Sequence, residues 1–196
     1  PVPTFDPAKD VLNRSRRSIA MDIKDPTDLA TLGRLIETAD VLIESFRPGV
    51  MERIGLGPDV CLDRNPRLVY VRVSGWGQEG PYSHAVGHDA NYISIAGLLA
   101  TIGYDADDRP VLPVAYTGDF GGGGMLAAFA TLAALVERAT SGRGQVIDTS
   151  ILDGAAILTA SNQSNISYSG EMRPRGQNFG DGGVPFYNVY RTKDGE

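Results

Sequence analysis

Apolar residues occur along the chain either in short compact runs or at helical spacing over longer stretches. In residues 26–39 the apolar positions recur at helical spacing. Asp25 and Pro26 favour a helix start there, because aspartate accepts from free N–H groups and proline needs no donor. The full pattern predicts strands at 18–23, 40–44, 67–74, 112–116 and 145–149, and helices at 26–39, 50–65 (one or two short ones), 89–100, 121–140 and 150–166.

Strands that alternate with helical segments of this length are typical of βαβ units. Such units build a parallel sheet, whose crossover helices cover both faces. We therefore predict an α/β fold with a parallel sheet and helices on both faces. Residues 101–113 and 170–185 are polar or rich in Gly and Arg, and we expect them to be irregular. The longest apolar run, 125–136, is too short for a bilayer, which needs about 20 residues, so no membrane span is predicted.

Composition narrows the class of protein. The 196 residues include 18 Lys and Arg against 24 Asp and Glu, a net charge of −6, and this length suits about one domain. Net negative charge argues against non-specific nucleic-acid binding, which needs a positive surface to displace counterions. A single cysteine excludes an internal disulfide, and with only two histidines no zinc cluster is predicted. A reducing compartment, the cytoplasm, is the expected location.

The first candidate for chemistry is His88, which lies where a loop meets a predicted helix. A histidine at a helix N-terminus faces the positive end of the helix dipole, which lowers its pKa and keeps the ring neutral and able to accept a proton. The alternative is that His88 and Asp89 only cap the helix.

The second candidate is Asp119, which stands between a predicted strand and a predicted helix and is followed by four glycines, 121–124. Ligands of parallel α/β sheets bind outside the carboxyl ends of the strands. Glycines let a ligand or another backbone approach closely. The alternative is an N-cap aspartate with tight helix packing. The segment is not a phosphate-binding P-loop, because no Gly-Lys-Ser/Thr follows, and the dinucleotide fingerprint is absent.

Basic residues gather near predicted turns in the first third of the chain. In a protein of negative net charge, such a cluster predicts a site for a phosphorylated ligand. A solvated face with salt bridges to Asp22 and Asp25 is the alternative. The cluster comprises Arg14, Arg16, Arg17, Lys24 and Arg47.

Several of these segments together resemble the family III CoA-transferases. Residues 40–50 (DVLIESFRPGV) and 65–81 (NPRLVYVRVSGWGQEGP) carry the family pattern. Residues 87–92 (GHDANY) and 118–123 (GDFGGG) resemble the α-methylacyl-CoA racemase branch of that family. So do 142–148 (GRGQVID) and the tail that starts at Arg175. The matching segments follow the family's order over nearly the whole chain.

The resemblance implies the Rossmann-like large domain of that fold, and inversion of the α-carbon of 2-methyl-branched acyl-CoA thioesters through an enolate. His88 matches the family's base on one face of the carbon and Asp119 its acid on the other, and we expect partial burial to raise the pKa of Asp119. No metal or redox cofactor is implied, since coenzyme A enters as part of the substrate. The segments implied to line the CoA and thioester sites are Met21, Asp22, Ile23 and Lys24, with Gly87, Asp89, Ala90, Asn91 and Tyr92, and Arg47 as a phosphate contact.

The resemblance also implies how the chain is divided into domains, how it assembles and where it is located. Residues 1–169 correspond to the large CoA-binding α/β domain without its first βα unit, and 170–196 to a linker toward a small domain that is absent, as in a chain truncated at both ends. Family members form interlocked homodimers, and a eukaryotic member would be peroxisomal or mitochondrial.

Three alternatives stay open. One is a family III CoA-transferase in which Asp119 is a nucleophile that forms an acyl anhydride. Another is a non-catalytic fragment that only binds CoA or a partner subunit. The third is a nucleotide-dependent oxidoreductase, which the βαβ pattern alone suggests. His88 discriminates between racemase and transferase, because the resemblance places no proton-transfer histidine there in the transferases.

Overall fold

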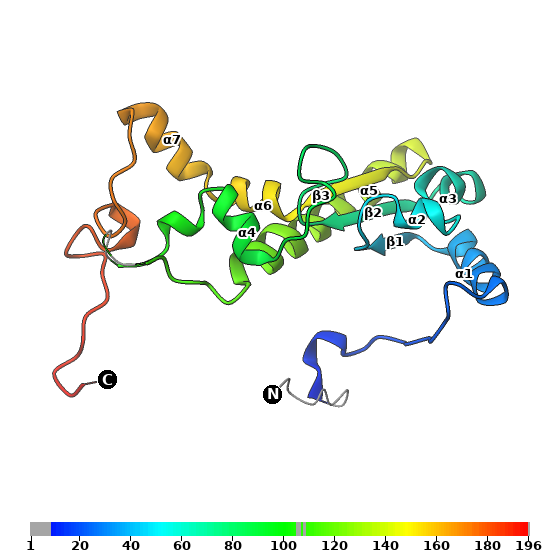
Figure 1. Cartoon of the computed structure of the whole chain (residues 1–196), viewed down its shortest axis with the longest axis horizontal. Coiled ribbons are helices and arrows are strands. Elements are labelled where there is room, and N and C mark those ends of the chain that lie inside the picture. The colour runs from blue at the N-terminus through cyan, green and yellow to red at the C-terminus, as the bar shows by residue number, and fades with distance from the viewer. Residues whose placement is uncertain (1–8, 105–106, 108, 196) are drawn as a thin grey trace.

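Three parallel strands form the centre of the computed structural model, which describes residues 9–104, 107 and 109–195 (Figure 1). They are β1 (Val41–Glu44), β2 (Val69–Ser74) and β3 (Val146–Ser150), in the order β1-β2-β3. Val41 lies opposite Val69, and Val71 opposite Ile147. The middle strand is buried over its first four residues, as expected for a strand with neighbours on both sides.

One face of the sheet is covered by α1 (Pro26–Thr38), α2 (Val50–Arg53) and α3 (Pro58–Arg64). Tyr70 of β2 points into this cluster, and its hydroxyl donates to the Leu56 carbonyl at 2.9 Å. Cys61 is fully buried in the same cluster, and burial raises the pKa of its thiol. The buried members are Ile36, Met51, Leu56, Cys61, Leu68 and Tyr70.

The other face is covered by α5 (Leu126–Ser141), whose Ala127 and Ala134 pack against Val69 and Val71. The Tyr70 side chain therefore lies on one face of the sheet, and the side chains of Val69 and Val71 lie on the other, because side chains alternate along a strand. The predicted α/β fold, with a parallel sheet and helices on both faces, is confirmed.

The helix predicted over 121–140 begins earlier in the structure, and its first part is not α-helical. η4 (Tyr116–Met125) is a π-helix, in which the Phe120 N–H donates to the Ala115 carbonyl five residues back, at 3.1 Å. It continues into α5, giving a helix of 26 residues. By length and composition this helix could cross a membrane. That is only weak evidence for a membrane span, because core helices of soluble proteins meet the same criterion. The predicted absence of a span stays a prediction.

The glycines of η4 allow a second helix, α6 (Ile151–Leu158), to lie directly against it. A Cβ on Gly154 would lie 2.0 Å from the Gly122 carbonyl oxygen, and one on Gly122 would lie 2.8 Å from the Ala155 nitrogen. The glycines at 121–124 were expected to let either a ligand or another backbone approach closely. At Gly122 it is the backbone of α6 that approaches.

Other predicted boundaries need correction. Residues 18–23 form no strand, and Ile19 is exposed, because no neighbouring strand lies beside them to accept their hydrogen bonds. Residues 112–116 form no strand either, since Val114 and Ala115 have positive φ angles (54° and 62°) and turn the chain into η4. The 89–100 helix is shorter, with α4 (Asp89–Ile95) separated from η3 (Leu99–Thr101) by Gly97 at φ 78°.

The helix predicted over 150–166 is divided at Thr159 into α6 and α7 (Ala160–Ser169). After it, the chain is largely irregular, as predicted, apart from η5 (Phe179–Asp181) and a bridge between Val184 and Tyr187. Part of the predicted loop 101–113 (105, 106 and 108) lies outside the described residues.

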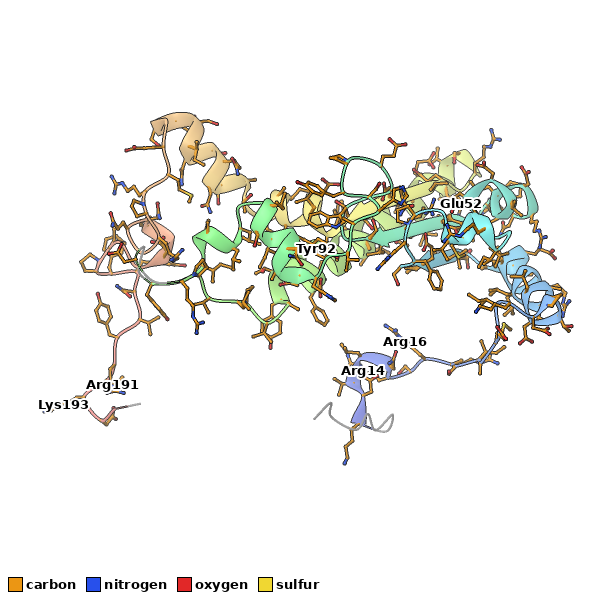
Figure 2. All side chains as sticks on the ribbon, viewed as in Figure 1. Arg14, Arg16, Glu52, Tyr92, Arg191 and Lys193 are labelled. Atoms are coloured by element: carbon orange, nitrogen blue, oxygen red, sulfur yellow. The ribbon has the colours of Figure 1, made fainter. Side chains whose placement is uncertain are left out.

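The first and last segments of the described residues extend away from the sheet (Figure 1). At the start, η2 (Val11–Asn13) leads to Arg14 and Arg16, which project from a segment remote from β1 (Figure 2). Asp22 and Asp25, the predicted salt-bridge partners of this basic cluster, make other contacts. The Asp25 side chain caps α1 by accepting from the Thr27 and Asp28 N–H groups, and the Asp22 carboxylate accepts from the Lys24 N–H.

Candidate active site

The N-terminus of α4 lies beyond the carboxyl ends of the strands and carries His88 as its N-cap residue. The His88 backbone N–H donates to the Asn91 side-chain Oδ1 at 3.0 Å and so fixes the start of α4. His88 therefore caps α4, and as a residue it is also exposed to solvent.

Tyr92 anchors this end of α4 against the loop that follows β2. Its ring is buried and meets Trp76 edge-on, with centroids 4.7 Å apart. A Cβ on Gly75 would lie 2.2 Å from the Tyr92 ring, and one on Gly87 2.6 Å from it. The two glycines are thus required for the ring to reach its place between them.

Asp119 lies in the first turn of η4 and not at its N-cap, which is Ala115. The Asp119 N–H donates to Asp89 Oδ1 at 2.8 Å, so η4 is joined to the start of α4. Partial burial raises the pKa of Asp119, the Asp89 charge raises it further, and His88 lowers it. The expected upward shift is confirmed, and residues 30 positions apart are brought into one electrostatic environment.

A cavity of about 240 Å³ lies at the carboxyl ends of β1 and β2, with His88 in its wall. Arg47 follows β1 at the cavity wall. Burial and the charge of Asp119 raise the pKa of Tyr92, and the charge of Arg47 partly opposes that rise. The Trp76 indole N–H is buried there and has no hydrogen-bond partner among the described residues. The lining residues are Phe46, Arg47, Pro48, Ser74, Gly75, Trp76, Ser83, Ala85, Val86, Gly87, His88 and Tyr92.

The predicted site residues fall into three groups. Arg47, Gly87, His88 and Tyr92 line the cavity, and Asp119 is not among the lining residues but lies within electrostatic reach of His88 and Tyr92. Asp89, Ala90 and Asn91 form the first turn of α4. Met21, Asp22, Ile23 and Lys24 precede α1 and are not among the lining residues, so their role in binding CoA stays a prediction.

Two features of the site were not predicted. The sequence pattern places Trp76 only in a loop, although a lone tryptophan beside two glycines is a signal for a built aromatic contact. The hydrogen bond from Asp119 to Asp89 joins segments far apart in the sequence, and no local pattern signals it.

Chemically, the arrangement places His88 and the Arg47 guanidinium at the wall of one cavity, and the Asp119 carboxyl, whose pKa is raised by burial and by Asp89, within electrostatic reach of His88. An imidazole and a carboxyl are side chains that can give and take protons. The family model described as CoA-transferase family III matches residues 6–196.

The chain belongs to CoA-transferase family III.

Relatives within the family have more than one activity in their names. The chain is 44% identical over 185 residues to alpha-methylacyl-CoA racemase of Homo sapiens, covering 94% of this chain and 48% of that protein. It is 37% identical over 188 residues to succinyl-CoA–D-citramalate CoA-transferase of Chloroflexus aurantiacus, covering 94% of this chain and 45% of the other. The chain thus spans about half the length of these family III relatives.

A solved structure shares the fold. A CAIB/BAIF family protein from Brucella suis superposes with a TM-score of 0.76 and 31% identity, over 81% of this chain and 42% of that one. The parallel sheet and its helices are thus the architecture of family III.

Proposed function

We propose that the protein is a racemase that interconverts the (2R) and (2S) forms of 2-methylacyl-CoA thioesters by moving the α-proton. The observation that carries this proposal is that Asp119, joined to the start of α4 by its hydrogen bond to Asp89, lies within electrostatic reach of His88, which lines the cavity. The identity to the human racemase supports it.

The reaction needs two groups that face opposite sides of the α-carbon. The neutral imidazole of His88 takes the α-proton from one face, and the electrons move onto the thioester oxygen to form an enolate. The protonated carboxyl of Asp119 then returns a proton to the other face, and in the reverse direction the two groups exchange roles. The raised pKa of Asp119 fits this task, because an aspartate of ordinary pKa holds almost no proton at neutral pH.

Arg47 contributes a fixed positive charge at the cavity wall, which suits the phosphate groups of CoA. Met21, Asp22, Ile23 and Lys24 complete the proposed CoA contacts. The proposal calls for no added cofactor and treats CoA as part of the substrate. A homodimer is part of the proposal too, supported by the exposed apolar residues Phe129, Leu132 and Val136 on α5, and equilibrium sedimentation measures it.

The test is deuterium incorporation at the α-carbon of a 2-methylacyl-CoA in heavy water. The unchanged chain should incorporate deuterium and invert the centre, and His88→Ala and Asp119→Ala should each lower the rate by about 10²–10⁴-fold. His84→Ala and Asp153→Asn are matched controls outside the cavity lining and should retain the rate. The assignment of His88 and Asp119 as the proton-transfer groups would be contradicted by an equal loss of rate in the two control variants. It would also be contradicted by a fully retained rate in His88→Ala or in Asp119→Ala.

A CoA-transferase is the second candidate, since the Chloroflexus relative is named as one. There Asp119 would attack the thioester carbonyl as a carboxylate, expelling CoA thiolate and forming an acyl anhydride. His88 in the cavity wall favours the racemase, because transfer through an acyl anhydride needs no proton-transfer histidine. Transfer of CoA between two acids that requires Asp119 but not His88, without α-exchange, would decide for the transferase. If neither activity occurs, calorimetric binding of CoA would favour a non-catalytic binding role.

A further inference from the structure

Asp89 makes two contacts with the catalytic segment of η4 that the proton-transfer scheme does not use. Its Oδ1 accepts the Asp119 N–H at 2.8 Å. The same oxygen lies so close to Gly118 that a Cβ there would be 2.1 Å away. Residue 118 must therefore lack a side chain for Asp89 to reach the Asp119 backbone.

The charge of Asp89 acts on the same residue as its hydrogen bond. Two neighbouring carboxyl groups disfavour double ionisation, so a negative Asp89 helps Asp119 to keep its proton. Asp89 lies in the first turn of α4, where the helix dipole favours negative charge. The ionisable groups that act on the Asp119 carboxyl are Asp89 and His88, both from the start of α4, while Tyr92 on α4 is itself affected by Asp119 and Arg47. No group on α5, α6, β2 or β3 in the described part of the chain contributes to this shift.

We propose that Asp89 is a positioning residue whose carboxylate fixes the backbone of Asp119 and sets a second negative charge beside the Asp119 carboxyl, an inference that rests on the proposed racemase function. The side chain of Asp89 thus serves the acid of the reaction and not the CoA moiety. Asp89→Asn and Asp89→Ala separate the two effects. Asparagine keeps an oxygen that accepts from the Asp119 N–H but removes the charge, and alanine removes both.

The experiment follows Asp119 directly by NMR in the full chain labelled with carboxyl-¹³C aspartate, with Asp119→Asn used to assign its signal. In Asp89→Asn the titration midpoint of Asp119 should move to lower pH, while hydrogen exchange of the Asp119 amide stays slow. In Asp89→Ala that amide should exchange roughly tenfold faster, the expected effect of losing one hydrogen bond. Asp153→Asn, an exposed aspartate on the neighbouring α6, is the matched control and should change neither signal.

An Asp119 midpoint that stays in place or rises in Asp89→Asn would overturn the charge effect. Unchanged amide exchange in Asp89→Ala would overturn the positioning effect, and if that variant does not fold, the Asp89→Asn titration alone decides. Both readouts are independent of turnover. If the unchanged chain incorporates no deuterium, the racemase proposal fails while the role of Asp89 is still measured. If it does, the alkaline limb of the exchange-rate profile, where Asp119 loses the proton that it must donate, should move to lower pH in Asp89→Asn, which a merely structural role would not cause.

Discussion

Gly154 on α6 tests how η4, the helical segment that carries Asp119, is held in place. An alanine there would place Cβ 2.0 Å from the Gly122 carbonyl oxygen, 2.4 Å from its carbon and 2.6 Å from its Cα. Since real Cβ atoms essentially never approach other atoms closer than 3.0 Å, α6 and η4 would have to separate. The obstructing atoms are backbone, so no rotamer change relieves the clash.

The magnitude follows from two opposing effects. Overpacking of a well-filled contact costs about 1–3 kcal/mol, and separating the helices also weakens the packing of Ala155, which is fully buried. Against this, glycine to alanine inside a helix stabilises by about 1 kcal/mol. We therefore expect Gly154→Ala to lower the free energy of unfolding by about 1–2 kcal/mol, and Tm by about 2–8 °C for a chain of this length.

The matched control is Gly124→Ala in η4 itself, where a Cβ meets only the Asp119 carbonyl oxygen at an ordinary 3.5 Å. This variant should be as stable as the unchanged chain or up to about 1 kcal/mol more stable. Thermal and urea unfolding followed by circular dichroism measure both variants. The reasoning is refuted if Gly154→Ala unfolds at the same temperature as Gly124→Ala or above it, because helix propensity would then outweigh the contact.

Two further predictions concern charges in the fold. Arg72→Ala should lower the free energy of unfolding by about 3–5 kcal/mol in urea, because it leaves the buried Glu44 carboxylate without its partner at 2.8 Å. Asp40→Asn breaks the pair with Arg138 on an exposed carboxylate and should cost less than about 1 kcal/mol. Burial raises the pKa of Tyr70. The free energy of unfolding should therefore be independent of this group below pH about 10 and fall above it, where the unfolded chain releases a proton that the folded chain keeps. Tyr70→Phe should flatten that decline, and unfolding curves at pH 9 and 11 would show whether it does.

Elements with strong local signals were predictable from the sequence. α1 begins where Asp25 and Pro26 indicate, because capping is decided by a few adjacent residues. β2 was evident from its β-branched residues, and the parallel fold followed from alternation. Residues 18–23 have similar β-like composition, yet a strand also needs a neighbour, and that requirement is not local.

In the candidate site, too, some features follow from local sequence signals and others depend on tertiary contacts. His88 and Asp119 could be selected from their position near predicted element ends and from the family resemblance. The winding that places Asp119 depends on positive φ angles at Val114 and Ala115, residues that rarely adopt them. The contact with Asp89 depends on how α4 and η4 pack together. Both are products of tertiary structure, so no sequence window reveals them.

The single thiol of the chain provides a built-in reporter on this fold. Cys61 is fully enclosed between α3 and its neighbours, with a raised pKa, so alkylating reagents that require an accessible thiolate should leave it unmodified in the folded protein. Its rate of modification would record how often the α1–α3 side of the core opens, separately from the α5 side. A cysteine introduced on the surface would then be the one site that reacts rapidly, which allows selective dye attachment without removing the native residue.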